Sequence, residues 1–326
     1  MLFIRWPLAA AVVALAPIAC SSPPPAGGVN PIVQTAHRAT SGERSWLKPA
    51  SKQQTLLYVT DAAGVTVYVN TGGTNFELAG ELFGFAVPAG ECTDARGDVF
   101  ITDETAQVID EYAHGAITPK AQIVDPFGQP LSCAIDRKTG RMAVTNASNP
   151  SGAYPGNVVI YSSPSGAPSE YSDSHLYVPL FCSFDRKSNL YVDGYDSSFH
   201  PVLSELSKSA QNFTILNLSG GTWFLPTGLL TKGTELLLGD LYDRSTHIYE
   251  VRVSGSTATI FNTIPLSKTQ DLAEFTLWES GSSTLILAPD NSYNNVEFYA
   301  YPNGSPIGAL TSGISQPVGT AISPGL

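Results

Sequence analysis

A short apolar run that ends in Asp or Asn occurs six times along this chain of 326 residues. The runs are LLYVTD, DVFITD, RMAVTN, NLYVD, ELLLGD and LILAPD, and they end at Asp61, Asp103, Asn146, Asp193, Asp240 and Asp290. Successive ends lie 42, 43, 47, 47 and 50 residues apart. Periods of this length are typical of propeller blades and other repeat arrays. We therefore expect the chain to fold as a repeat protein.

Further strand-like segments surround each run. Four copies have a Pro-led segment before the run: PAGECTD, PLSCAID, PLFCSFD and PTGLLTK. A segment rich in β-branched residues and Tyr follows the run, as in NVVIYSS around Tyr161, and most copies continue with a weaker fourth segment such as FTILNL. Four strands in each period correspond to one propeller blade.

The two ends of the repeat complement each other. The first copy starts near Thr55 without a Pro-led segment, whereas the chain finishes with such a segment in QPVGTAISPGL. We expect the C-terminal strand to complete blade one, because a ring closed in this way has no open sheet edge. The predicted fold class is an all-β, six-bladed β-propeller of four-stranded blades over residues 55–326.

Composition agrees with many short strands and tight turns. Hydrophobic residues make up 43% of the chain, which is enough for a large core. Charged residues make up 14%, while 29 Gly and 24 Pro supply turn formers. The net charge is −11 and no cluster of Lys and Arg could neutralise a run of phosphates. Nucleic acid is therefore not expected as a partner.

Residues 1–20 have the layout of a secretory signal peptide, with Arg5 before an apolar run from Trp6 to Ala19 that is too short to span a bilayer. The end of this segment resembles a lipoprotein box, which implies cleavage before Cys20 and lipidation of that residue; ordinary cleavage near Ala19 is the alternative. Residues 21–54, which begin SSPPPAGGVNP, are expected to be a Pro/Gly/Ser-rich tether without a compact fold. We expect an exported protein of the periplasm or cell envelope, anchored to the membrane if Cys20 carries lipid.

The pattern P-x-G-x-x-x-D from Pro88 to Asp94 precedes an apolar strand that ends in Asp and a strand that ends in Tyr. It resembles the NHL and SMP-30-like six-bladed propellers, and the resemblance extends over residues 55–326. The resemblance implies a fold more than a function, because this architecture hosts binding modules, lactonases, lyases and dehydrogenases. It also implies that loops entering the innermost strands and loops joining second to third strands share one face, which is usually the ligand face.

The Asp and Asn row is expected on that face. Each side chain could cap its own hairpin through backbone N–H groups, or several could bind a hard cation such as Ca²⁺. Pairs three residues apart, such as Asp193 with Asp196, keep the second interpretation open, and aromatic residues in the same loops suit a saccharide or peptide. The ligand-face candidates are Asp61, Asp103, Asn146, Tyr154, Asp193, Tyr195, Asp196, His200, Asp240, Tyr242, Asp290 and Tyr293.

Three cysteines and one glutamate lie in the expected innermost strands. A disulfide is expected between Cys133 and Cys182 or between Cys92 and Cys133, with small buried packing residues as the alternative. No spacing of Cys or His predicts zinc. Glu91 occupies the strand position of Cys133 and Cys182, so it is either an acid in water at the mouth of the channel or a catalytic acid or metal ligand.

Common catalytic motifs are missing: the sequence has no G-x-S-x-G, H-E-x-x-H, phosphate loop or dinucleotide fingerprint. We therefore expect a monomeric, non-catalytic binding or scaffold module for a peptide, a saccharide or an envelope protein, with no cofactor other than Ca²⁺ as an option. The alternative follows from the SMP-30 resemblance. It is a lactonase or esterase in which a divalent cation polarises a carbonyl, with Glu91 and part of the Asp row as ligands.

Overall fold

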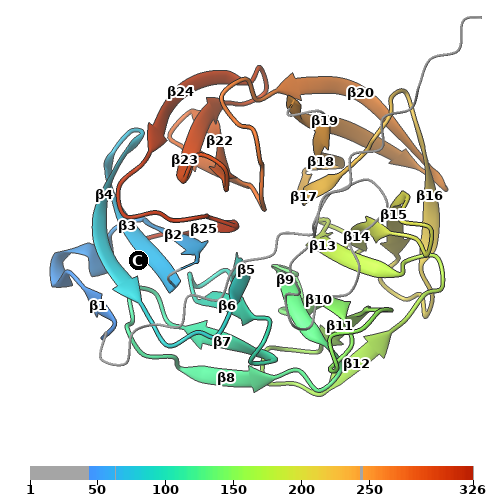
Figure 1. Ribbon diagram of the computed structural model, residues 1–326, viewed down its shortest axis with the longest axis horizontal. Helices are drawn as coiled ribbons and strands as arrows, with labels where there is room; N and C mark the ends of the chain where they lie inside the picture. The colour runs from blue at the N-terminus through green and yellow to red at the C-terminus, as the bar shows by residue number, and fades with distance from the viewer. Residues whose placement is uncertain (1–43, 63, 243–244, 326) are drawn as a thin grey trace, which may run out of the picture.

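The strands form sheets arranged in a ring around a central axis (Figure 1). The structure, a computed structural model, describes residues 44–62, 64–242 and 245–325. Apart from one short 3-10 helix, η1 (Pro49–Gln53), the regular elements of these residues are β-strands. The predicted all-β propeller is confirmed.

Three sheets have four antiparallel strands, with the innermost strand given first. They are β5 (Pro88–Thr93), β6 (Val99–Asp103), β7 (Val108–Tyr112) and β8 (Ala121–Val124); β9 (Gln129–Ile135), β10 (Met142–Ser148), β11 (Asn157–Tyr161) and β12 (Pro168–Tyr171); and β21 (Thr276–Ser280), β22 (Ser283–Asp290), β23 (Asn295–Ala300) and β24 (Ser305–Leu310). Each is built from strands that follow one another in the chain, as expected for a blade.

The C-terminal strand closes a fourth sheet against the start of the repeat. The order outward is β25 (Gly319–Ser323), β2 (Leu56–Asp61), β3 (Gly64–Gly72), β4 (Asn75–Leu82) and β1 (Trp46–Leu47). The strands β25 and β2 pair antiparallel, from Leu56 opposite Ser323 to Thr60 opposite Gly319. The two ends of the propeller are thus held together by backbone hydrogen bonds.

The fifth sheet has eight strands and departs from the expected plan. It contains β13 (Val178–Phe184), β14 (Leu190–Tyr195), β15 (Pro201–Leu206), β16 (Thr214–Ser219), β17 (Pro226–Lys232), β18 (Glu235–Tyr242), β19 (Ser245–Ser254) and β20 (Thr257–Pro265). Two antiparallel sets of four strands meet where β16 and β20 pair in parallel, with Asn217 opposite Thr257. The expectation of separate four-stranded sheets is wrong here, because two outermost strands come close enough to share hydrogen bonds.

Part of the expected tether belongs to the folded domain. Within residues 44–54, β1 pairs with β4 and η1 follows it. Trp46 Nε1 donates to Glu81 Oε2 at 3.2 Å. The expected boundary at residue 54 is therefore too late, because β1 covers the otherwise unpaired edge of β4. The expected signal peptide, Cys20 and the expected tether up to residue 43 lie outside the described residues.

Burial explains the apolar runs of the sequence. Every residue of β2 and of β6 is buried, whereas five of the six residues of the outermost strand β24 are exposed. A strand covered on both faces reads as a continuous apolar run, because neither face meets water. The second strand of each set carries such an apolar run, and the recurring Asp or Asn lies at or within three residues of the strand's end.

Six clusters of buried apolar side chains fill the spaces between neighbouring sets of strands. Phe100 and Met142, for example, pack between the β5–β8 and β9–β12 sheets. Leu57 of β2 packs with Leu287 of β22, so apolar packing also joins the first and last sheets of the ring. In the described part of the chain, no helix is both long and apolar enough to cross a membrane.

Candidate functional site

The recurring acids hold the loops of one face, which we call the loop face. It consists of the loops that enter the innermost strands and those that join the second and third strands of each set. The carboxylate of Asp103, at the end of β6, accepts hydrogen bonds from Ala86 N at 2.6 Å and Val87 N at 2.9 Å. Asp240 Oδ1 accepts in the same way from Phe224 N and Leu225 N. Each acid therefore fixes the loop that leads to an innermost strand.

The whole row lies beneath the loop face. Its six members are 0–2% exposed: Asp61, Asp103, Asn146, Asp193, Asp240 and Asp290. Asp61 accepts from Gly64 N at 3.1 Å, and Asn146 donates to Asn157 Oδ1 at 2.8 Å. The contact of Asp61 matches the capping interpretation, whereas Asn146 is held by side-chain oxygens and not by the backbone N–H groups of its hairpin. The structure places the row as a support for the loops, and not as a ring open to a ligand.

One group of loop-face aromatics belongs to the core. Tyr154, Tyr177 and Phe199 pack together with ring centroids 5.7–6.3 Å apart, and they are partly buried. Tyr195 is only 6% exposed and packs against Phe199. Tyr195 is therefore a core residue, because the chain folds back over it after β14.

A second group of aromatics is open to solvent. Phe224 and Tyr242 stack with ring centroids 4.0 Å apart and an interplanar angle of 22°, and they are 43% and 54% exposed. Tyr293, in the turn between β22 and β23, is 51% exposed. Phe224 was not among the predicted residues, although its place two residues before the Pro-led strand β17 was a usable signal. Exposed rings on rigidly held loops are free to contact a ligand.

The candidates Asp196 and His200 shape a surface turn. Asp196 Oδ1 accepts from Ser198 N at 2.8 Å and from His200 N at 2.9 Å. The ring nitrogen Nδ1 of His200 lies 3.4 Å from Asp196 Oδ2. The pair is exposed, so the contacts organise this turn and leave the imidazole in water.

Two buried glutamates lie beside the central axis, Glu91 on β5 and Glu274 just before β21, and they are 5% and 9% exposed. Burial raises the pKa of Glu91 well above its ordinary value; a hydrogen bond from Thr60 opposes the shift and the charge of Glu274 adds to it. Burial likewise raises the pKa of Glu274 to about 8, although Ser132 Oγ donates to Glu274 Oε1 at 2.5 Å. Glu274 therefore favours the neutral form near pH 7, and the pKa of Glu91 is shifted in the same direction. The prediction of a water-exposed acid at Glu91 is wrong.

Glu274 was missed in the sequence because its repeat copy lacks the leading Pro that aligns the others. Its position explains Gly90: a Cβ at residue 90 would lie 2.3 Å from Glu274 Oε2, so only glycine leaves room for the carboxyl group. That Oε2 atom and Oε2 of Glu91 have no hydrogen-bond partner among the described residues. The two acids form a tightly enclosed pair at the centre of the ring.

The space beside this pair is too small for a substrate. A cavity of about 10 Å³, lined by Glu274, Glu104, Leu131, Phe181 and other residues of the innermost strands, has room for about one water molecule. Burial, with a contribution from the charge of Asp103, raises the pKa of Glu104 to about 7. Small-molecule sites usually measure about 300–1,000 Å³, so this centre is a packed polar core.

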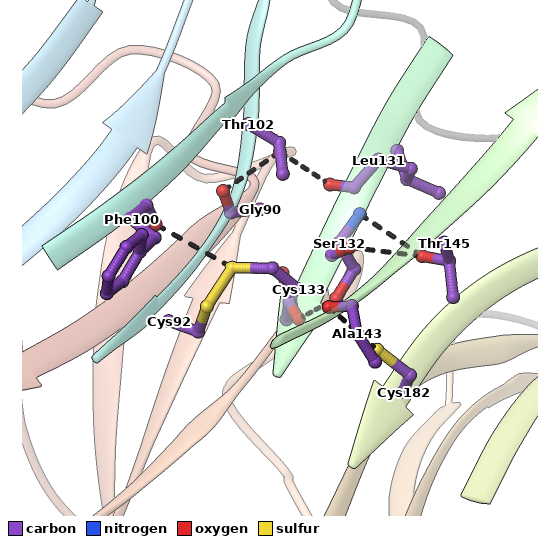
Figure 2. The surroundings of a disulfide bond; sticks show 11 residues. Gly90, Cys92, Phe100, Thr102, Leu131, Ser132, Cys133, Ala143, Thr145 and Cys182 are labelled. Atoms are coloured by element: carbon purple, nitrogen blue, oxygen red, sulfur yellow. Dashed lines mark hydrogen bonds between the residues drawn. A yellow bond between two sulfur atoms is a disulfide. The ribbon is translucent and has the colours of Figure 1, made fainter. Parts of the chain in front are cut away.

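Threonines that precede the row acids tie neighbouring sheets together. Thr102 Oγ1 donates to the carbonyl oxygens of Gly90 at 3.0 Å and Leu131 at 2.9 Å, which belong to β5 and β9 (Figure 2). Thr145 Oγ1 donates to Leu180 O of β13 at 2.6 Å. This role was not predicted, although Thr precedes the acid or amide in three of the six runs.

A disulfide strengthens the same innermost layer. Cys92 of β5 and Cys133 of β9 are bonded, with their Cα atoms 5.7 Å apart (Figure 2). Cys182 of β13 is a buried free thiol, and burial raises its pKa well above the ordinary value. Of the two pairings left open by the sequence, the structure has Cys92–Cys133 and does not have Cys133–Cys182.

The candidate metal ligands do not gather into one donor set. In residues 44–62, 64–242 and 245–325, no three or more His, Cys, Asp or Glu side chains lie together so that they could hold a metal ion. Carboxylates of the row accept hydrogen bonds from backbone N–H groups, as at Asp103 and Asp290. The carboxylates of Asp103 and Asp290 are thus already held by backbone N–H groups.

The raised pKa of Glu274 predicts that the free energy of unfolding falls as pH rises. In the folded state Glu274 keeps its proton up to a pKa of about 8, above the ordinary value of 4.5, so between these values the folded state binds more protons than the unfolded state. We expect the melting midpoint to be at least about 3 °C lower at pH 8.5 than at pH 5.5, because even one pKa unit corresponds to about 1.4 kcal/mol. His114 acts in the opposite sense below pH 6.5, because burial lowers its pKa.

Thermal melts of the full chain with Glu274→Gln isolate this contribution. The substitution should shrink the difference between the two pH values, whereas Glu77→Gln, at an exposed glutamate, should leave it unchanged. A wild-type pH profile that persists in Glu274→Gln would show that Glu274 does not carry the effect.

Comparisons with known proteins define the class of the chain. No protein-family model matches it, and no curated protein matches it. A solved nidogen/laminin complex contains a chain that is similar with a TM-score of 0.65 and 16% identity, over 82% of this chain and 98% of that one. A solved structure of a proposed gluconolactonase is similar with a TM-score of 0.53 and 14% identity, over 71% of this chain and 80% of that one. At these identities the likeness shows the fold alone, and the protein is a β-propeller.

Proposed function

We propose that this protein is an exported, non-catalytic binding module that presents the loop face of a six-bladed propeller to a peptide, a saccharide or an envelope protein. The observation that carries the proposal is the exposed ring stack of Phe224 and Tyr242, together with the exposed ring of Tyr293 in the chain's last set of strands. Asp240 fixes the loop that carries Phe224, and Asp290 fixes the turn that carries Tyr293. One of the similar structures is a protein complex, which agrees with a binding role.

Six blades follow if the eight-stranded sheet is counted as two. Its two antiparallel sets of four strands each end in an outermost strand, and a separate apolar cluster packs between them. The same count is supported by the six recurring Asp or Asn residues and by the six apolar clusters that lie between neighbouring sets of strands. The sheet closed by β25 is then blade one.

Export and membrane anchoring are part of the proposal. The signal-like segment of residues 1–20 and Cys20 support them, and so does the Cys92–Cys133 bond, because disulfides persist in oxidising compartments. The protein would act in the periplasm or cell envelope.

The lactonase alternative has weaker support. It rests on the buried acids Glu91 and Glu274 and on the likeness to the proposed gluconolactonase. The cavity beside them is about 10 Å³, and the described residues supply no cluster of three metal-binding side chains. Binding at the loop face requires neither a large central cavity nor a metal ion.

Thermal melts of the full chain separate the two functions. The ligands are a panel of short peptides and neutral oligosaccharides and, separately, Ca²⁺, Mg²⁺, Zn²⁺ or Mn²⁺ added after a chelator. A ligand at about 100 times its Kd adds about 2.7 kcal/mol, so we expect a peptide or oligosaccharide to raise the midpoint by several degrees. Hydrolysis of a lactone that requires a cation and is lost in Glu91→Gln would overturn the proposal.

A further inference from the structure

We infer that a groove beside Tyr293 is a binding site for a neutral oligosaccharide; this deepens the proposed function and rests on it. The groove has a volume of about 540 Å³, which lies in the range of small-molecule sites. Its walls come from the beginning of β19, from the loop after β20, and from the β22–β23 turn. The residues that matter most are Thr246, Ser267, Lys268, Gln270, Tyr293 and Glu297.

The chemistry of the lining suits a ligand with many hydroxyl groups and no net charge. Hydroxyl groups of Thr246 and Ser267 and the amide of Gln270 can donate and accept hydrogen bonds. Lys268 and Glu297 have opposite charges, so the groove has no excess of either sign. The half-exposed ring of Tyr293 offers a flat apolar surface on which the C–H face of a sugar ring can stack, with its polar tip in water.

A buried hydroxyl group in the lining has no partner. Thr246 is 3% exposed and lines the groove, yet its Oγ1 makes no hydrogen bond with the described residues. A buried polar atom without a partner costs free energy, so such atoms are uncommon and need an explanation. The oxygen itself is buried, so a hydroxyl group of a ligand in the groove would supply the missing hydrogen bond after the Thr246 side chain turns toward the groove.

One buried carboxylate holds both walls of the groove. Asp290 Oδ1 accepts from Tyr293 N at 3.1 Å, and Asp290 Oδ2 accepts from Gln270 N at 2.6 Å. The loop after β20 is fixed further because Lys268 N donates to the hydroxyl of Tyr299 at 2.9 Å. The groove is thus formed before a ligand arrives, which lowers the entropic cost of binding. Asp290, a ligand-face candidate, acts here as a positioning residue.

The test uses the full chain with short neutral oligosaccharides of glucose, galactose, mannose and N-acetylglucosamine, screened on an array and then titrated by calorimetry. We expect at least one to bind, and Tyr293→Ala to weaken it by at least about tenfold. Thr246→Val removes the hydroxyl group and keeps the shape. It should weaken the oligosaccharide by a similar factor while the melting midpoint of the free protein stays the same or rises.

Thr227→Val is the matched control, because Thr227 is also buried with an unpartnered Oγ1 but lies outside the groove. It should leave oligosaccharide affinity unchanged. If no oligosaccharide binds while a peptide binds in a way that needs Phe224 and Tyr242, the saccharide site is refuted and the binding module stands. If neither class binds, both proposals fail. Binding that Thr246→Val and Tyr293→Ala leave intact would place the saccharide elsewhere and overturn this site.

Discussion

Deleting residues 316–326 should lower the melting midpoint by more than about 12 °C. The deletion removes β25, so five paired residues of β2 lose their partners on the axial side. About five backbone hydrogen bonds at about 1 kcal/mol each, together with the burial of Val318 at about 1.5–3 kcal/mol, exceed 6 kcal/mol. At about 2–4 °C per kcal/mol, this loss gives the expected shift.

A chain that ends at Ser323 is the matched control. It keeps all of β25 and the hydrogen bond from Ser323 Oγ to Gly97 O, which joins blade one to the next sheet at 2.6 Å. Its midpoint should lie within a few degrees of the wild type. Equal melting of the long and short deletions would show that β25 does not close the ring.

Removing the Cys92–Cys133 disulfide should lower the midpoint by about 8–15 °C. The bond closes a loop with a sequence separation of 41 residues, and in the chain-entropy account such a loop contributes about 4 kcal/mol. The measurement is a thermal melt of the Cys92→Ala/Cys133→Ala variant beside the oxidised wild type. Both sulfur atoms lie between neighbouring sheets, so the loss loosens the innermost layer.

Reductant provides the control for this second prediction. It should destabilise the wild type and Cys182→Ala to a similar extent, because Cys182 forms no disulfide. It should have no further effect on Cys92→Ala/Cys133→Ala. A reductant effect that survives the double substitution would mean that another process lowers the midpoint.

The repeat made the propeller predictable. An apolar run that ends in Asp indicates a strand that is buried on both faces, followed by an acid that holds a loop, as at Asp103. The spacing of these runs along the chain therefore indicated the repeating sets of strands. Glu274 could not be found in this way, because its role depends on side chains from other sheets around the axis. Pairing of β16 with β20 also escaped prediction, since it depends on how closely two outermost strands approach.

The candidate site was predicted only in part. That the loops of the candidate site share one face was predictable, because loop position follows from strand order. The direction of each side chain was not, because loops fold back: Tyr195 lies in the core, whereas Tyr242 is exposed. Likewise, strand position suggested that Cys133 and Cys182 are equivalent, but a disulfide forms where Cα atoms come close, which is at Cys92 and Cys133.

The central claim is that the loop face binds a ligand, and the most direct test is equilibrium binding of the peptide and oligosaccharide panel to four forms of the full chain. They are the wild type, Phe224→Ser/Tyr242→Ser, Tyr293→Ala, and Val124→Ser/Ile307→Ser, whose substituted residues are exposed on the outermost strands. We predict that a ligand binds the wild type and the outer-strand variant equally and is weakened by at least about tenfold in a loop-face variant. Binding that is lost only in the outer-strand variant, or no binding to the wild type, would contradict the claim.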